Sequence, residues 1–203
     1  MRQFDAVASM MAADLSHDTK GSGIFVSGKG MLLSRYVELV TDRSVERFLL
    51  RLFLREAPIR SLCIVSPYIA SLEGHRFSLA DVRKKAEVDQ IPTYVITREP
   101  SEPYQEEAMQ VLLGSPWIEL RYNASIHAKL YVASAEREAE SFALFGSGNL
   151  TAKAIESNIE LAMLVYNGGD GRHLLHDLHY WAAVRLRTLY ESKLIQPIRA
   201  RRR

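Results

Sequence analysis

The sequence predicts an α/β fold in which a mixed, largely parallel sheet is layered between helices. Strand and helix patterns alternate over residues 59–122, and such alternation is typical of parallel strands joined by helical crossovers. Three further strand patterns follow over residues 126–166 with short connections, and a long helical pattern over residues 171–193 comes after them.

The composition indicates one globular domain in a reducing compartment. The 203 residues are 47% hydrophobic, which is enough for a core that folds without disulfides, and Cys63 is the single cysteine. No apolar stretch reaches membrane-spanning length, and the N-terminus lacks a signal-peptide pattern. We therefore expect a soluble cytoplasmic protein with no membrane association, in which Cys63 is buried in a strand.

The first part of the chain carries the weakest patterns. Residues 1–22 are expected to form an extension with a short helix, followed by a single domain over residues 23–195. Residues 23–39 have strand or mixed character. An amphipathic helix is predicted over residues 44–57, where apolar residues recur at helical spacing.

The alternating elements come next. A buried strand begins at residue 59 and ends at Ser66-Pro67. The elements that follow are a helix over 79–89, a strand over 91–98, a helix over 102–114 and a strand over 117–123.

Three pairs of polar residues, each spaced i to i+2, are set in the apolar runs of the last three strands. The pairs are His127 with Lys129, Ser147 with Asn149, and Asn158 with Glu160. Alternate side chains of a strand share a face, so each pair points one way while its apolar neighbours point the other. Burying such groups is costly unless they are satisfied or used, so the pairs predict a functional site.

Each pair taken alone has an ordinary explanation. His127 is most simply a satisfied core histidine, residues 146–149 are an ordinary turn, and Asn158 with Glu160 lies on a solvated strand face. The three pairs taken together, in this order, favour the functional interpretation.

The segment 126–160 resembles the phospholipase D superfamily. The signature of that family runs His-x-Lys, four residues, Asp, a spacer and Gly-Ser-x-Asn, often followed by an Asn-x-Glu strand. The matching residues here are His127, Lys129, Gly146, Ser147, Asn149, Asn158 and Glu160. Ser66-Pro67-Tyr68 after a buried strand also resembles the first half of such domains.

The chain departs from the signature in two places. Ser134 stands at the position of the aspartate, and the spacer before Gly146 is longer and contains the charged stretch over residues 135–140. This form resembles the divergent branches of the family, which include DNA-processing phosphodiesterases and restriction-type nucleases. The resemblance implies a phospholipase D-like α/β/α sandwich and phosphodiesterase activity.

The site residues suit phosphodiester cleavage. A neutral His127 imidazole can attack phosphorus if an acceptor holds its other ring nitrogen, and Glu160 is the candidate acceptor. Lys129, about 6.6 Å from His127 along a strand, can neutralise the phosphate oxygens, and the side chains of Asn149 and Ser147 can donate hydrogen bonds to them.

The prediction also covers two glycines of the site and the question of a metal ion. Gly146 and Gly148 leave room for the backbone to approach the phosphate. We expect no metal and no other cofactor, because Lys129 and the amides can supply the electrostatic stabilisation. His173, His176 and His179 recur on the C-terminal helix, but their spacing drifts around the helix, so a polar or interface face is favoured over a zinc site.

The His-x-Lys motif occurs once in this chain. Members of the family either carry two copies or pair two chains with one copy each, so the resemblance implies a homodimer with its site across the two-fold axis. One His127 would attack and form a phosphohistidine, and the other would protonate the leaving oxygen.

The expected partner is DNA or another nucleic acid, with the protein acting alone or as the nuclease part of a larger restriction or defence complex. The net charge of +2 does not establish this by itself. Residues 196–203 form a basic tail, which is either a solvated terminus, favoured on sequence alone, or a phosphate-contacting arm. The candidate contacts to nucleic acid are Arg98, Lys153, Arg201, Arg202 and Arg203.

Two other functions remain open. A lipid phosphodiesterase or phosphatidyltransferase is disfavoured because no membrane anchor or apolar interfacial loop stands out. A catalytically weakened nucleic-acid-binding subunit is motivated by Ser134, although His127, Lys129 and Asn149 are all present.

Overall fold

The computed structural model describes residues 30–54 and 57–199, with side chains from residue 35 onward. The expected extension over residues 1–22 lies outside the described residues. The described strands form one sheet in the order β1-β2-β8-β7-β6-β3-β4-β5-β9. Their bounds are β1 Gly30–Ser34, β2 Val37–Val40, β3 Ile59–Val65, β4 Thr93–Thr97, β5 Ile118–Tyr122, β6 Lys129–Ala135, β7 Phe142–Gly146, β8 Ala162–Tyr166 and β9 Lys193–Gln196.

The sheet is mixed, as predicted, but parallel pairing is confined to one part of it. Strand β4 pairs in parallel with both β3 and β5, which are the strands joined by helical crossovers. The other neighbouring pairs of described strands are antiparallel. This corrects the expected predominance of parallel pairing, because the short connections after β5 reverse the chain direction and do not cross over the sheet.

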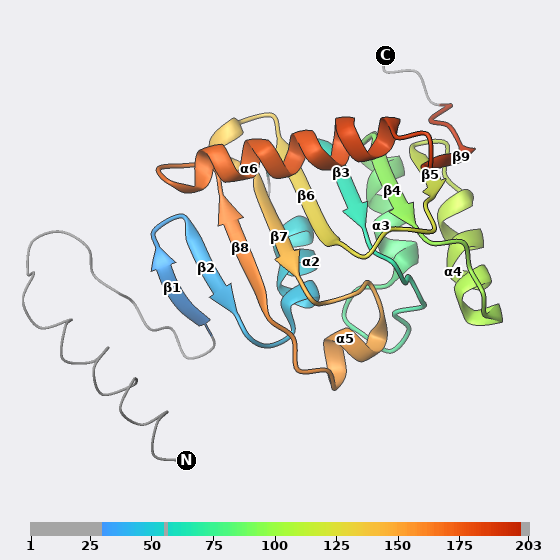
Figure 1. The fold of residues 1–203 in the computed structure, drawn as a ribbon, viewed down its shortest axis with the longest axis horizontal. Coiled ribbons are helices and arrows are strands. Elements are labelled where there is room, and N and C mark those ends of the chain that lie inside the picture. Colours follow the sequence, from blue (N-terminus) through green and yellow to red (C-terminus); the bar gives the residue numbers. More distant parts are fainter. Residues whose placement is uncertain (1–29, 55–56, 200–203) are drawn as a thin grey trace, which may run out of the picture.

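Helices cover both faces of the sheet, which confirms the predicted layering (Figure 1). The helices that pack into the core of one face are α2 Ser44–Leu54, α3 Leu79–Val88, α4 Pro103–Leu113 and the short α5 Ala152–Glu156. The other face is covered by α6 Gly171–Tyr180 and its π-helical continuation η3 Trp181–Leu186. A 3₁₀ turn, η2 Glu138–Glu140, joins β6 to β7.

Local signals explain where the helices begin and which faces they bury. In α2 the predicted apolar stripe is buried, and the ring of Phe48 packs 5.4 Å from that of Tyr131 and 5.2 Å from that of Phe142. Ser78 and Asp81 form a reciprocal capping box at the start of α3. Pro103 occupies the first turn of α4, where its missing N–H costs nothing.

The core of the α6 face contains Cys63, as the sequence predicts. Burial raises the pKa of this thiol to about 12, so it stays protonated and packs as a small apolar group.

Helical structure at the C-terminal end stops earlier than expected, and residues 193–196 form strand β9 against β5. Within the described residues, no helix combines the length and apolarity needed to cross a membrane.

Candidate active site

Three strand ends meet at one edge of the sheet, beside α5 (Figure 1). Lys129 at the start of β6 is the direct partner of Gly146 at the end of β7. Gly146 is in turn the partner of Ala162 at the start of β8. The segments that precede β6, follow β7 and precede β8 therefore leave the sheet side by side, and these segments carry the polar pairs.

The site side chain of β6 at this edge lies on the face of the sheet that α2 covers. Side chains alternate along β6, and Tyr131 and Ala133 belong to the core under α2, so Lys129 lies on the α2 face as well. The carboxyl end of β3 reaches the same edge, because Val65 pairs with Leu130. The site is thus open to solvent at the sheet edge, with α2 and α5 beside it.

His127 and Lys129 are in contact at this edge. The ammonium of Lys129 lies 3.3 Å from Nδ1 of His127 and donates a hydrogen bond of 3.1 Å to the main-chain oxygen of His127. A charged lysine has donors only, so a hydrogen bond in this contact corresponds to the neutral tautomer in which Nδ1 accepts and Nε2 carries the proton. The exposed histidine therefore presents an N–H group outward from this contact.

Glu160 lies beneath the surface with 5% of its area exposed. Its two carboxylate oxygens accept hydrogen bonds from the hydroxyl of Ser147 and, at 3.0 Å, from the side-chain amide of Asn158. The main-chain N–H of Leu161 donates to Ser147 Oγ at 3.0 Å. Among the described residues no hydrogen bond joins Glu160 to His127 of the same chain, so the expected role of Glu160 as the acceptor for that imidazole is not seen here.

The loop over residues 146–150 is held by the sheet below it. The buried hydroxyl of Tyr131 donates to the carbonyl of Gly148 at 2.9 Å, and the N–H of Leu150 donates to Ser66 Oγ at 3.0 Å. Burial raises the pKa of Tyr131, against a smaller opposing effect of the Ser66 hydrogen bond. A Cβ on Gly146 would lie 2.6 Å from the Cα of Ala162, so only glycine fits there.

Two polar atoms beside this loop have no hydrogen-bond partner among the described residues. The hydroxyl of Ser44, at the start of α2, and the amide oxygen of Asn149 are both buried without a hydrogen bond. A Cβ added to Gly148 would lie 3.0 Å from the Ser44 oxygen, which places Ser44 directly against the loop. Unpaired buried polar atoms in a native fold call for an explanation, and a bound ligand at this edge would supply one.

Sequence reasoning missed Ser44. The signal available was a serine at the start of a predicted helix, which is read as a cap and not as a site residue. Ser66 and Tyr68 were noted in the sequence, and the structure connects them to the loop, since Ser66 Oγ also donates to the Tyr68 carbonyl at 2.7 Å.

The predicted nucleic-acid contacts fall in different places. Arg98 is tied to the His127 segment, because its Nε donates to the carbonyl of Ile126 at 2.9 Å and one terminal nitrogen donates to the hydroxyl of Tyr68 at 3.1 Å. Lys153 is exposed on α5, next to the loop. Arg201, Arg202 and Arg203 lie outside the described residues.

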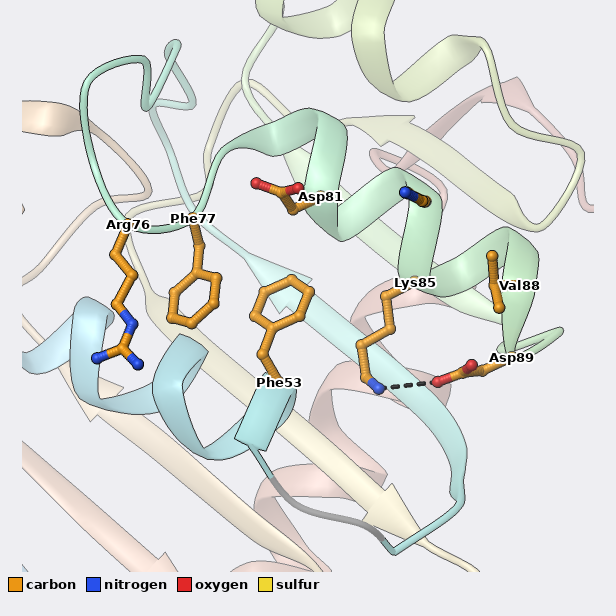
Figure 2. A pocket seen from close by; sticks show the side chains of 8 residues that line it. Phe53, Arg76, Phe77, Asp81, Lys85, Val88 and Asp89 are labelled. Atoms are coloured by element: carbon orange, nitrogen blue, oxygen red, sulfur yellow. Dashed lines mark hydrogen bonds and ion pairs between the residues drawn. The ribbon is translucent and has the colours of Figure 1, made fainter.

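A hollow of about 380 Å³ between α2 and α3 does not belong to this site (Figure 2). Phe53 and Phe77 stack in it with ring centroids 4.4 Å apart. The Arg76 guanidinium lies 5.6 Å from the Phe77 ring and the Lys85 ammonium 6.0 Å from the Phe53 ring, while Lys85 is paired with Asp89 at 2.8 Å. The aromatic and cationic groups of this hollow thus interact mainly with one another.

The comparisons with known proteins identify the fold. No protein-family model matches the sequence, and no curated protein matches it significantly. Among solved structures, the chain is similar to Nuc, a phospholipase D family member from Salmonella typhimurium, with a TM-score of 0.56 and 16% identity over 79% of this chain and 99% of that chain.

Two further structures are similar. NucT from Helicobacter pylori matches with a TM-score of 0.53 and 15% identity over 78% of this chain and 98% of that chain. TrmBL2, described as an archaeal chromatin protein with a novel mode of DNA binding, matches with a TM-score of 0.51 and 11% identity over 96% of this chain and 62% of that chain. The described fold is therefore phospholipase D-like, as the sequence resemblance implied.

Proposed function

We propose that this protein is a phosphodiesterase of the phospholipase D type, and specifically a metal-independent nuclease that cleaves DNA. The observation that carries the proposal is the register of β6, β7 and β8, which brings the His127, Ser147 and Glu160 segments to one sheet edge. The likeness in fold to Nuc, a phospholipase D family member, supports the phosphodiesterase class.

The groups at this edge suit a phosphate diester. The Lys129 ammonium supplies a positive charge, and the Asn149 side chain offers amide donors on the loop over residues 146–150. Donors and charges that are already oriented stabilise the charge that develops on the phosphate oxygens without reorganisation. A resident lysine can therefore take the electrostatic role that a metal ion plays in other nucleases, which is the basis for proposing metal independence.

The contact between Lys129 and His127 bears on the order of steps. With Nδ1 accepting from Lys129, the imidazole carries its proton on Nε2, so it is set to donate a proton and not to attack. Attack through Nε2 needs the other tautomer, with Nδ1 donating to an acceptor. Two copies of His127 in different surroundings would supply both roles, one as nucleophile and one as acid.

The need for two His127 side chains with different roles leads to a homodimer. Each chain carries one His-x-Lys motif, so we propose that two chains place their sheet edges against each other around one phosphate. The exposed apolar side chains beside the site suit such a contact, because Ile159 is 100% exposed and Leu161 is 57% exposed. The acceptor for the attacking imidazole would then come from the partner chain.

DNA is the proposed substrate because of the cations around the site. Arg98 and Lys153 lie beside it. Phosphate contacts of this kind give binding that depends on salt but not on base sequence.

DNA binding without cleavage is the second candidate. It is supported by the likeness to TrmBL2 and by the finding that, among the described residues of one chain, Glu160 is hydrogen-bonded to Ser147 and Asn158 and not to His127. The two candidates share a binding surface and differ in turnover.

The deciding experiment incubates the purified protein with plasmid, with oligonucleotide and with phospholipid vesicles, each with excess EDTA. We expect nicking or cleavage of DNA that survives the chelator, no release of lipid headgroup, and a solution mass twice the 23.0 kDa of one chain. Cleavage that stops with EDTA and returns with magnesium would reject metal independence. DNA binding with no cleavage under any condition would favour the second candidate.

A further inference from the structure

A second polar hollow lies at the opposite end of the sheet, under α6. Its volume is about 250 Å³, and its polar lining includes Arg60, Ser134, Ser141, Arg172, His176 and His179. Strand β6 connects it to the candidate active site. Ser134 is five residues beyond Lys129 on this strand, so the two side chains point to opposite faces and are about 17 Å apart along the strand. The hollow is therefore separate from the active site.

The lining is rich in cations that come from two sides. Arg60 comes from β3, while Arg172, His176 and His179 come from α6. The carboxylate that lines the hollow is Glu138 of η2, and Asp177 on α6 lies 3.6 Å from Nδ1 of His176. In the lining itself two arginines stand against the single carboxylate of Glu138, so positive charge is in excess without any contribution from the imidazoles.

Two serines provide hydrogen bonds on the sheet side of the hollow. Ser134 and Ser141 are buried, at 6% and 8% exposure. The hydroxyl oxygen of Ser141 accepts from the N–H of Ala135 at 2.9 Å, which leaves its own proton to donate elsewhere. Guanidinium groups, imidazoles and hydroxyls around one small space are the donors that recognise an oxyanion.

We propose that this hollow binds a phosphate group, either as free inorganic phosphate or as the terminal phosphate of a nucleotide chain. The hydroxyl of Ser134 takes the position that is aspartate in the family signature described above. A carboxylate there would add negative charge to the lining and repel an anion, whereas a serine adds a hydrogen-bond donor without charge. The departure from the signature thus creates the site.

The histidines make this binding dependent on pH. Burial lowers the pKa of His179, and the nearby charges of Arg60 and His176 lower it further. A bound phosphate would favour protonation of His179, against this lowering of its pKa.

The test is calorimetric titration of the full chain with inorganic phosphate, in a Lys129→Ala background that removes the main cation of the active site. Ser134→Asp should weaken phosphate binding by about tenfold or more, equivalent to about 1.4 kcal/mol. Ser134→Ala should weaken it less, since it removes one donor without adding charge. Arg172→Ala should also weaken binding. Because Arg172 is exposed on α6, this variant tests the helix side of the hollow without changing the sheet.

Two further arms separate the ligand sources and the alternatives. A 5′-phosphorylated dinucleotide is compared with the same dinucleotide lacking the phosphate. Binding of both inorganic phosphate and the phosphorylated form identifies a general phosphate site, and binding of the phosphorylated form alone identifies a strand-end site. The proposal is overturned if neither binds, if the form without phosphate binds equally well, or if Ser134→Asp and Arg172→Ala both bind phosphate like the parent. These are binding measurements and do not depend on nuclease activity.

Discussion

The hydroxyl of Ser147 donates a hydrogen bond to the carboxylate of Glu160, which is buried where β8 begins. The second oxygen of the same carboxylate accepts from Asn158 at 3.0 Å. Residues from the loop after β7 and from the segment before β8 are thereby held together. These hydrogen bonds give Glu160 a positioning role that does not depend on any contact with His127. Substitution of Glu160 should therefore act on the stability of the fold, whereas substitution of His127 or Lys129 should act on turnover.

Glu160→Gln should lower the free energy of unfolding by about 1–3 kcal/mol, the usual effect of leaving a buried polar group unsatisfied. Glutamine offers one oxygen to two donors and turns its NH₂ group toward one of them. Urea denaturation would measure the change. Glu136→Gln is the matched control, because Glu136 is exposed. Equal stability of the two variants would show that the carboxylate does not hold these segments.

Substitutions of the proposed chemical groups should act on turnover and not on folding. His127→Ala should abolish cleavage, while Lys129→Ala and Asn149→Ala should each reduce kcat by about 10²-fold or more, as for removal of one oriented donor. His127 is exposed and Lys129 is partly exposed, so their loss should leave the fold intact.

A plasmid-nicking time course measures these rates. His173→Ala, which removes an exposed histidine on α6, is the control and should cleave at the parent rate. A His127→Ala protein with full activity would contradict the phosphodiesterase mechanism as a whole.

The sequence predicts much of this site because its chemistry lies in short i to i+2 pairs. His127 with Lys129 and Ser147 with Asn149 can be read from alternation alone, and the register of β6 and β7 then places them together. Ser44 could not be found in this way. It approaches Gly148 only because β2 pairs with β8 and delivers the start of α2 to the same edge, and no local pattern encodes that strand order.

The parts of the fold that escaped prediction depend on long-range pairing. Residues 193–196 are too few and too mixed to indicate a strand, and β9 exists because the edge of β5 is open to pair with it. For the same reason the sequence predicts an end of the C-terminal helix, near residue 193, that is later than the one in the structure. The tail begins within this strand, and the N–H of Arg199 still donates to the carbonyl of Pro116 at 2.9 Å.

Arg187→Met should destabilise the protein, because Arg187 joins the end of the C-terminal helix to β5. Both of its side-chain hydrogen bonds to Glu119 are 2.6 Å long, and Glu119 is only 4% exposed. Arg121 also donates to Glu119, so the carboxylate keeps one partner. We expect a loss of about 1–3 kcal/mol in free energy of unfolding, below the 3–5 kcal/mol for a buried charge left with no partner.

The same pair predicts a dependence on pH. Burial acts to raise the pKa of Glu119, but the hydrogen bonds and charges of Arg187 and Arg121 outweigh it and lower the pKa. The stabilisation is therefore fully present above the unfolded glutamate pKa of about 4.3 and is lost as the pH falls through the lowered folded value. Urea titrations across this range should show a weaker acid dependence for Arg187→Met. An unchanged dependence would show that Arg187 does not set the Glu119 pKa.

Removal of residues 198–203 should preserve folding and dimerisation but weaken DNA binding. The segment contains Arg199, Arg201, Arg202 and Arg203 and follows β9 in the chain, so we expect its loss to remove positive charge without disturbing the core. Each arginine that contacts a phosphate releases counterions, so the slope of log affinity against log salt should fall in magnitude by about 0.9 per lost contact.

Fluorescence anisotropy with labelled duplex DNA at several salt concentrations measures both quantities. Changing Arg201, Arg202 and Arg203 to glutamine in the full chain keeps the Arg199 hydrogen bond to Pro116 and isolates the charge, while the lysine triple variant keeps the charge and should bind nearly like the parent. If the glutamine variant binds with unchanged affinity and salt slope, the tail is a solvated terminus. Arg98 and Lys153, which lie at the site itself, would then be the residues to substitute in the search for the DNA contact.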